Sequence, residues 1–130
     1  MSEPIDDGRT PRERGMAKMQ EVYGFQYDPA DVEGDYIDFT VDHLFGTVWT
    51  REGLDVRERR MITIGALAAL GLGNLLEIQF TSALNNEEFT EDQIREIVIH
   101  LTHYVGWPLS TSMNAAAEKV IAQRRKAAEQ

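Results

Sequence analysis

The chain has 130 residues and a mass of 14.7 kDa, which is enough for one domain with a buried core. Hydrophobic residues make up 42% and charged residues 27%, a balance typical of a soluble globular protein and not of a disordered one. The absence of cysteine excludes disulfides, zinc–thiolate sites, iron–sulfur clusters and thiol nucleophiles, and the net charge of −9 argues against a nucleic-acid partner.

The polar residues 1–10 show no periodicity, so we expect a mobile tail there. The sequence Thr-Pro-Arg-Glu at 10–13 combines a capping box with proline at the first helical position, which predicts a helix over 11–23 that ends at Gly24. Gly15 lies inside this helix and lowers its intrinsic stability by about 1 kcal/mol relative to alanine.

After a loop, apolar residues at a spacing near 3.6 predict a second helix over 34–48. A capping-box candidate at 55–58 predicts the start of a third helix, which continues to Leu70 and is ended by Gly71 and Gly73. This helix is apolar on nearly all sides, so we expect it to be central and buried.

A fourth helix is predicted over 74–84. The clearest capping box of the chain, at 90–93, opens a fifth helix that ends near Gly106. A Trp-Pro pair forbids a smooth continuation, and a sixth helix follows over 109–126. The prediction is therefore an all-α, single-domain bundle of about six helices, with the domain over 11–130.

The longest apolar run, over 61–72, is shorter than the roughly 20 residues that a membrane-spanning helix needs. The first residues are acidic and unlike a signal peptide. We therefore expect a cytoplasmic protein without a membrane partner.

A cluster of four arginines stands out in this acidic chain: Arg51, Arg57, Arg59 and Arg60. Guanidinium groups bind carboxylates through two parallel hydrogen bonds, so the cluster is compatible with an acidic small molecule. The alternatives are a solvated helix start paired with neighbouring acids, or a subunit contact.

Glu96, His100 and His103 share one helical face. They fit a general acid–base set, because histidine titrates near neutrality, or a weak metal-ligand pattern. A structural alternative places one histidine in the core and the other at the surface.

Three aromatic residues, Trp49, Tyr104 and Trp107, each lie near a helix end. They are candidates for pocket walls, for core residues or for anchors at a subunit interface.

Several segments of the chain form a recognisable pattern. Residues 44–59 read LFGTVWTREGLDVRER, and the pattern continues over 62–71 and resumes in three later segments. These later segments are 83–86 (Ala-Leu-Asn-Asn), 91–98 and 104–108 (Tyr-Val-Gly-Trp-Pro). Together they resemble the γ-carboxymuconolactone decarboxylases, and residues 14–24 match that family's first helix. The resemblance covers about 11 to 122.

This resemblance implies an all-helical protomer of the alkyl hydroperoxidase D-like fold, assembled as a homo-oligomer, a hexamer built as a trimer of dimers. It implies a small acidic substrate, with no cofactor and no metal. The related peroxidases work through a Cys-x-x-Cys pair, and the lack of cysteine excludes that redox activity.

The function that the resemblance implies is a cofactor-free decarboxylase that converts 4-carboxymuconolactone to the β-ketoadipate enol-lactone in aromatic catabolism, or a close relative with an altered substrate. The alternatives are a non-catalytic oligomeric family member and a cysteine-free relative of the peroxidase branch. Chemical type and resemblance together assign Arg57 and Arg59 as carboxylate anchors, Gln79 as a substrate-orienting group, His100 as the proton donor, and Tyr104 and Trp49 as pocket walls.

The chain departs from the family's pattern at three places. Gln79 stands where the decarboxylases usually carry a histidine, and glutamine cannot exchange a proton near pH 7. Glu87 and Glu88 follow the Asn-Asn pair, where a glycine is usual, and Trp107 replaces a residue that is often small.

Overall fold

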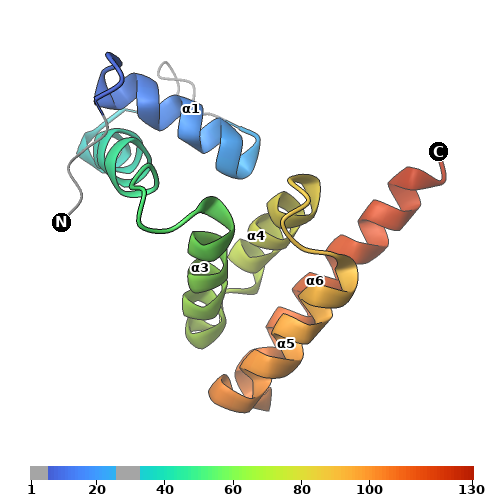
Figure 1. Cartoon of the computed structure of the whole chain (residues 1–130). Coiled ribbons are helices and arrows are strands. Elements are labelled where there is room, and N and C mark those ends of the chain that lie inside the picture. The colour runs from blue at the N-terminus through green and yellow to red at the C-terminus, as the bar shows by residue number, and fades with distance from the viewer. Residues whose placement is uncertain (1–5, 26–32) are drawn as a thin grey trace. The chain divides into compact units, whose positions relative to one another are not determined.

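The computed structural model describes residues 6–25 and 33–130, and within these residues the secondary structure is helical, with no strand. The all-α prediction is confirmed. The chain divides into two compact units, an N-terminal unit up to Arg59 and a C-terminal unit, Arg60–Gln130 (Figure 1). In the part of the chain that is described, no helix has the length and apolar character needed to cross a membrane.

Helix α1 (Pro11–Tyr23) begins and ends where the sequence predicts. The Thr10 hydroxyl accepts a hydrogen bond from the Glu13 amide, and the Glu13 carboxylate accepts one from the Thr10 amide, which completes the capping box. Gly24 ends the helix in a left-handed conformation, with φ of 76°.

Residues 1–5 of the predicted mobile tail lie outside the residues that the structure describes. The part that is described is attached to α1. The Arg14 guanidinium donates to the backbone oxygen of Arg9 at 2.6 Å and lies 3.5 Å from the Asp7 carboxylate. These contacts connect residues 7–9 to the start of the helix.

The predicted second helix corresponds to α2 (Asp35–Asp38) followed directly by η1 (Phe39–Val48), which is a π-helix. The spacing of apolar residues predicted helix without distinguishing the two types. Helix η1 packs on α1, and glycine allows the close approach at two positions. A Cβ atom at Gly15 would overlap the backbone oxygen of Val41, and one at Gly46 would overlap that of Pro11.

The core of the N-terminal unit is formed where α1 meets η1. Phe45 stacks on Trp49 with ring centroids 6.0 Å apart, and Tyr23 meets the edge of Phe45 at 5.6 Å. Its buried members are Met19, Val22, Val41, Phe45 and Trp49.

The C-terminal unit contains most of α3 (Val56–Leu70) and all of α4 (Gly73–Asn85), α5 (Glu91–Val105) and α6 (Trp107–Ala128). Helix α6 packs against both α4 and α5 (Figure 1). The buried apolar face of α6 is formed by Met113, Ala116, Ala117, Val120 and Ile121. The Thr90–Gln93 capping box is also present. Gly106, with φ of 86°, separates α5 from α6, which begins two residues earlier than predicted and carries proline in its first turn.

The expectation that the third helix is central and buried is wrong. Only one face of α3 is buried, through Arg60, Ile64 and Ala68. Met61, Ile62 and Leu70 are exposed, as are other large apolar residues of this unit. The physical reason is that a helix apolar on all sides needs neighbours on all sides, and the C-terminal unit supplies a core on one side only.

Candidate functional site

A buried guanidinium lies at the centre of a polar cluster in the C-terminal unit. Arg60, on α3, has no exposed surface. Its Nε donates to Glu88 Oε1 at 2.9 Å and its Nη2 donates to Glu88 Oε2 at 3.0 Å, which is the paired geometry that arginine forms with carboxylates. Its Nη1 donates to Gln79 Oε1 at 3.0 Å.

The partners of Arg60 come from α4 and from the turn that follows it. Gln79 is itself buried, on the face of α4 that carries Phe80 and Ala83. Glu88 lies in the turn between α4 and α5, and it also accepts a hydrogen bond from Asn86 Nδ2 at 3.1 Å. Three elements therefore converge on one cation.

The cluster balances the charge of a buried guanidinium. Burying an unpaired guanidinium costs several kcal/mol, and a carboxylate with well-aligned hydrogen bonds offsets much of that cost. The side chain of Glu88 is 9% exposed, so the acid is nearly as buried as the base. The Gln79 amide oxygen accepts a hydrogen bond from Arg60, and an amide does not exchange a proton near pH 7.

A second candidate site is a cationic pocket in the N-terminal unit, with a volume of about 430 Å³. Two of the predicted site residues, Arg57 and Trp49, line it together. Lys18 and Arg51 add positive charge, and Glu21 and Asp55 are the acids; Lys18 lies 2.9 Å from Glu21. The aromatic wall is rigid, because Trp49 is 7% exposed and stacks on Phe45.

Arg59 supports the loop that forms this pocket. Its Nε donates to the Leu54 carbonyl at 3.2 Å and its Nη2 donates to the Arg51 carbonyl at 3.1 Å. These bonds fix the backbone of residues 51–54, which carries pocket-lining side chains. The structure thus separates the two predicted anchors: Arg57 lines the pocket, and Arg59 holds its rim.

His100 and Tyr104 lie together on the exposed side of α5. Their ring centroids are 5.1 Å apart, and Tyr104 is 78% exposed. His100 lines a shallow pocket of about 350 Å³ together with Glu96 and Met61. Gln79, by contrast, is buried among the partners of Arg60. In the described residues, no group of three or more histidine, aspartate or glutamate side chains is arranged to hold a metal ion.

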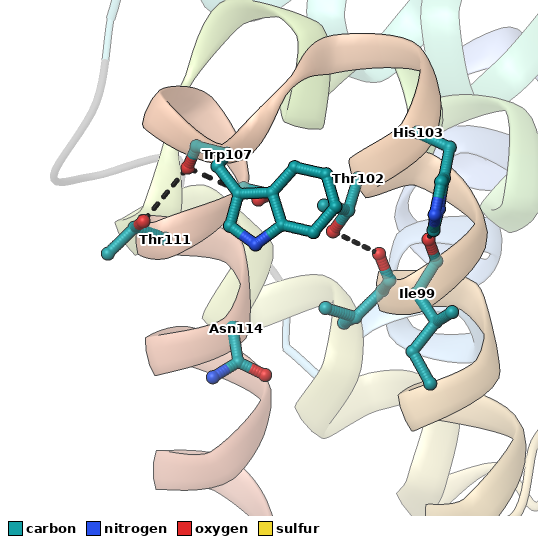
Figure 2. Close-up of a pocket in the computed structure, with 8 residues that line it drawn as sticks. Ile99, Thr102, His103, Trp107, Thr111 and Asn114 are labelled. Atoms are coloured by element: carbon teal, nitrogen blue, oxygen red, sulfur yellow. Dashed lines mark hydrogen bonds between the residues drawn. The ribbon is translucent and has the colours of Figure 1, made fainter.

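A further pocket, of about 300 Å³, lies between α5 and α6. Figure 2 shows the Trp107 indole standing over it, with Thr111 and Asn114 on the α6 side and His103 on the α5 side. His103 Nδ1 contacts the Ile99 carbonyl at 2.7 Å. None of the six predicted site residues lines this pocket.

Sequence reasoning assigned no role to Arg60 beyond its place in the arginine cluster. A signal was present, because Arg60, Ile64 and Ala68 are spaced four residues apart and form the one buried face of α3. Glu88 was noted only as a departure from the family's pattern. It is 28 residues from Arg60 in the chain, so no local pattern connects the two.

The chain matches the carboxymuconolactone decarboxylase family over residues 34–119. The 4-carboxymuconolactone decarboxylase of Acinetobacter baylyi is 33% identical over 90 residues, which cover 69% of this chain and 66% of that protein. The nitrosuccinic acid decarboxylase of Metarhizium robertsii is 35% identical over 77 residues, 59% of this chain and 53% of that protein. The aligned part thus spans about two thirds of the first relative's length and about half of the second's. On this match, which covers most of the chain, the protein belongs to the carboxymuconolactone decarboxylase family.

Proposed function

We propose that the protein is a cofactor-free decarboxylase of a small acid with more than one carboxylate, of the 4-carboxymuconolactone type or a close relative. The observation that carries this proposal is the family match over 34–119, together with two relatives that are both named as decarboxylases. Both names denote substrates that carry two carboxyl groups. The two relatives are named for different acids, so proteins of this family do not all share one substrate. The substrate of this chain can therefore be a third acid of the same class.

The reaction requires three functions of the protein. The carbon–carbon bond to one carboxylate breaks, carbon dioxide leaves, and the electron pair stays on carbon as an enolate-type anion, which then takes up a proton. The protein must hold the remaining carboxylate, stabilise the anion and deliver the proton.

The cationic pocket is the proposed site that holds the remaining carboxylate. Arg57 is the proposed carboxylate anchor, Trp49 is a wall, and Arg59 positions the 51–54 loop between them. A charge-assisted hydrogen bond contributes roughly 1.5–3 kcal/mol to binding. Such a bond helps to offset the long-range repulsion between an acidic substrate and a protein with a net charge of −9.

His100 is the proposed proton donor, with Tyr104 beside it, and Gln79 is proposed to orient the substrate through the Arg60 guanidinium that it holds. The two rings are exposed, so we propose that a second copy of the chain covers this face of α5 in a homo-oligomer, a hexamer built as a trimer of dimers. A soluble enzyme of this kind would act in the cytoplasm.

The direct test is an assay of the purified protein with 4-carboxymuconolactone and with nitrosuccinic acid, following carbon dioxide release. We expect turnover of at least one of them. Arg57→Ala should lower kcat/KM by about ten- to a hundredfold, because it removes a charge-assisted bond to the substrate. Arg125→Ala is the matched control, since Arg125 is an exposed arginine that pairs with Glu91 outside the pocket. Equal effects of the two variants would contradict the assignment.

Gln79→His tests the residue at which this chain departs from the family. A histidine there would regain a group that titrates near neutrality, so we expect decarboxylation of 4-carboxymuconolactone to rise. An unchanged rate would show that position 79 does not limit the reaction.

The ion pair between Arg60 and Glu88 favours a second candidate function, a family member that binds an acid without converting it. Arg60 pairs with the Glu88 carboxylate and is held by Gln79, and neither arginine nor glutamine exchanges a proton near pH 7. These two residues can therefore hold a carboxylate but cannot deliver the proton that decarboxylation needs. Ligand binding to the purified protein without any carbon dioxide release would select this alternative.

A further inference from the structure

The carboxylate of Glu88 makes the paired contact with Arg60 that a free carboxylate makes with a guanidinium. Both of its oxygens accept from the Nε and Nη2 edge of Arg60, at 2.9 Å and 3.0 Å. This edge is the one that binds a free carboxylate through two parallel bonds.

The receptor half of the pair is rigid. Arg60 lies on the buried face of α3, with Ile64 and Ala68 one and two turns further along. Its Nη1 is held by Gln79, a buried residue of α4, at 3.0 Å. Two helices therefore fix the direction of the guanidinium independently of Glu88.

The acidic half is placed where it can be displaced. Glu88 belongs to the turn after α4 and not to a helix, and Asn86 and Glu87 before it are exposed. Glu87 has φ of 55°, a left-handed conformation that costs a non-glycine residue energy. Glu88 also has the exposed edge of the pair, with 9% of its side chain accessible against none for Arg60.

We propose that Arg60 is a receptor for the carboxylate of a small organic acid, and that Glu88 is the internal carboxylate that fills the receptor when no acid is bound. The inference goes beyond the proposed function, because Arg60 does not line the Arg57 pocket, and it rests on that function for the identity of the acid as substrate. Binding exchanges one carboxylate for another at the same guanidinium, with no covalent step. Gln79 positions the receptor, and the turn carries Glu88 away as the acid enters.

The test uses acetate and succinate as probes and reads binding, not turnover. The ¹⁵N–¹H cross-peak of Arg60 Nε, assigned by its loss in Arg60→Lys, is followed while each acid is added to the full-length protein. Sodium chloride at equal ionic strength controls for screening. Glu88→Ala removes the internal carboxylate. Glu87→Ala is the matched control, because it removes one glutamate from the same turn without touching Arg60.

We expect the wild-type cross-peak to shift saturably with both acids and not with chloride. Glu88→Ala should bind them at least tenfold more tightly, and Glu87→Ala should bind like the wild type. If Glu88→Ala does not fold, Glu88→Gln replaces it, with the same expected direction, because a neutral amide competes less well for the guanidinium. A wild-type cross-peak that no acid moves, or a Glu88 variant that binds no more tightly than the wild type, would overturn the proposal.

The outcomes separate this inference from the proposed function. If acetate and succinate bind at Arg60 but the protein releases no carbon dioxide from 4-carboxymuconolactone or nitrosuccinic acid, the receptor proposal is supported and the decarboxylase proposal is refuted. If the protein turns over either substrate but neither acetate nor succinate shifts the Arg60 cross-peak, the decarboxylase proposal is supported and the receptor proposal is refuted.

Discussion

The left-handed backbone at Glu87 offers a test at a single residue. Its φ of 55° costs a residue with a Cβ roughly 1–2 kcal/mol, and glycine escapes this cost. Glu87→Gly should therefore raise the free energy of unfolding by about 1 kcal/mol, measured by urea denaturation.

Glu87→Ala is the control for that substitution, because alanine removes the charge and keeps the unfavourable backbone. Its stability should stay close to that of the wild type. Equal stabilisation by both substitutions would point to charge, and not to backbone conformation, as the cause.

Some contacts within the two candidate sites could be predicted from the sequence, and others could not. Arg57 and Trp49 line one pocket. They are close in the sequence, so their proximity in space could be expected from the sequence alone. Arg60 and Glu88 meet only because α3 and the turn after α4 converge. Residue chemistry does not encode that convergence, and the arginine cluster therefore gave no reason to prefer Arg60 over its neighbours.

Among the helices, the crossing of α1 and η1 depends on two glycines. A methyl group at Gly15 would overlap the backbone oxygen of Val41, and backbone can yield only by separating the helices. Gly15→Ala should therefore destabilise the protein by about 1–3 kcal/mol, although alanine is the better helix former. Thermal unfolding followed by circular dichroism measures this.

Gly65→Ala is the matched control, since Gly65 lies inside α3 and a Cβ there meets nothing within 4 Å. This substitution should stabilise the protein by about 0.5–1 kcal/mol. A loss at position 65, or a gain at position 15, would contradict the packing that we describe.

The segment before α1 should respond to acid. A hydrogen bond from the Arg9 side chain lowers the pKa of Asp7 from its ordinary 3.8 to about 2, and Arg14 contributes. Because the pKa is lowered in the folded protein, this contribution is complete above about pH 4 and is lost as the pH falls towards 2. An NMR titration of the Asp7 carboxyl carbon should give the low midpoint, and Arg9→Ala should raise it. A midpoint near 3.8 in the wild type would refute the contact.

Helix boundaries were predictable where local chemistry sets them. The capping boxes at Thr10 and Thr90 and the glycine ends at Gly24 and Gly106 depend on residues within one turn. The π-helical form of η1 and the one-sided burial of α3 depend on what packs against them, and composition carries no record of that packing.

For the whole molecule, exposed apolar residues predict self-association. The exposed set in the C-terminal unit comprises Met61, Ile62, Leu70, Leu75, Ile78, Ile99, Tyr104, Trp107 and Leu109. Surface of this kind is typical of protein–protein contacts. Light scattering at micromolar concentration should give a multiple of 14.7 kDa. Leu70→Glu should lower that multiple, and Thr81→Glu, an exposed polar control on α4, should not. A wild-type mass of a single chain would refute the prediction.

The two tryptophans of the chain fall one in each unit and in opposite surroundings. Trp49 is stacked on Phe45 in the core of the N-terminal unit, whereas Trp107, at the start of α6, is 65% exposed beside His103. The buried indole should emit at the shorter wavelength and resist iodide, while the exposed indole should emit at the longer wavelength and be quenched. Intrinsic fluorescence can therefore follow each unit separately without a label, with Trp49 reporting melting of the first unit and Trp107 reporting any partner that covers the second.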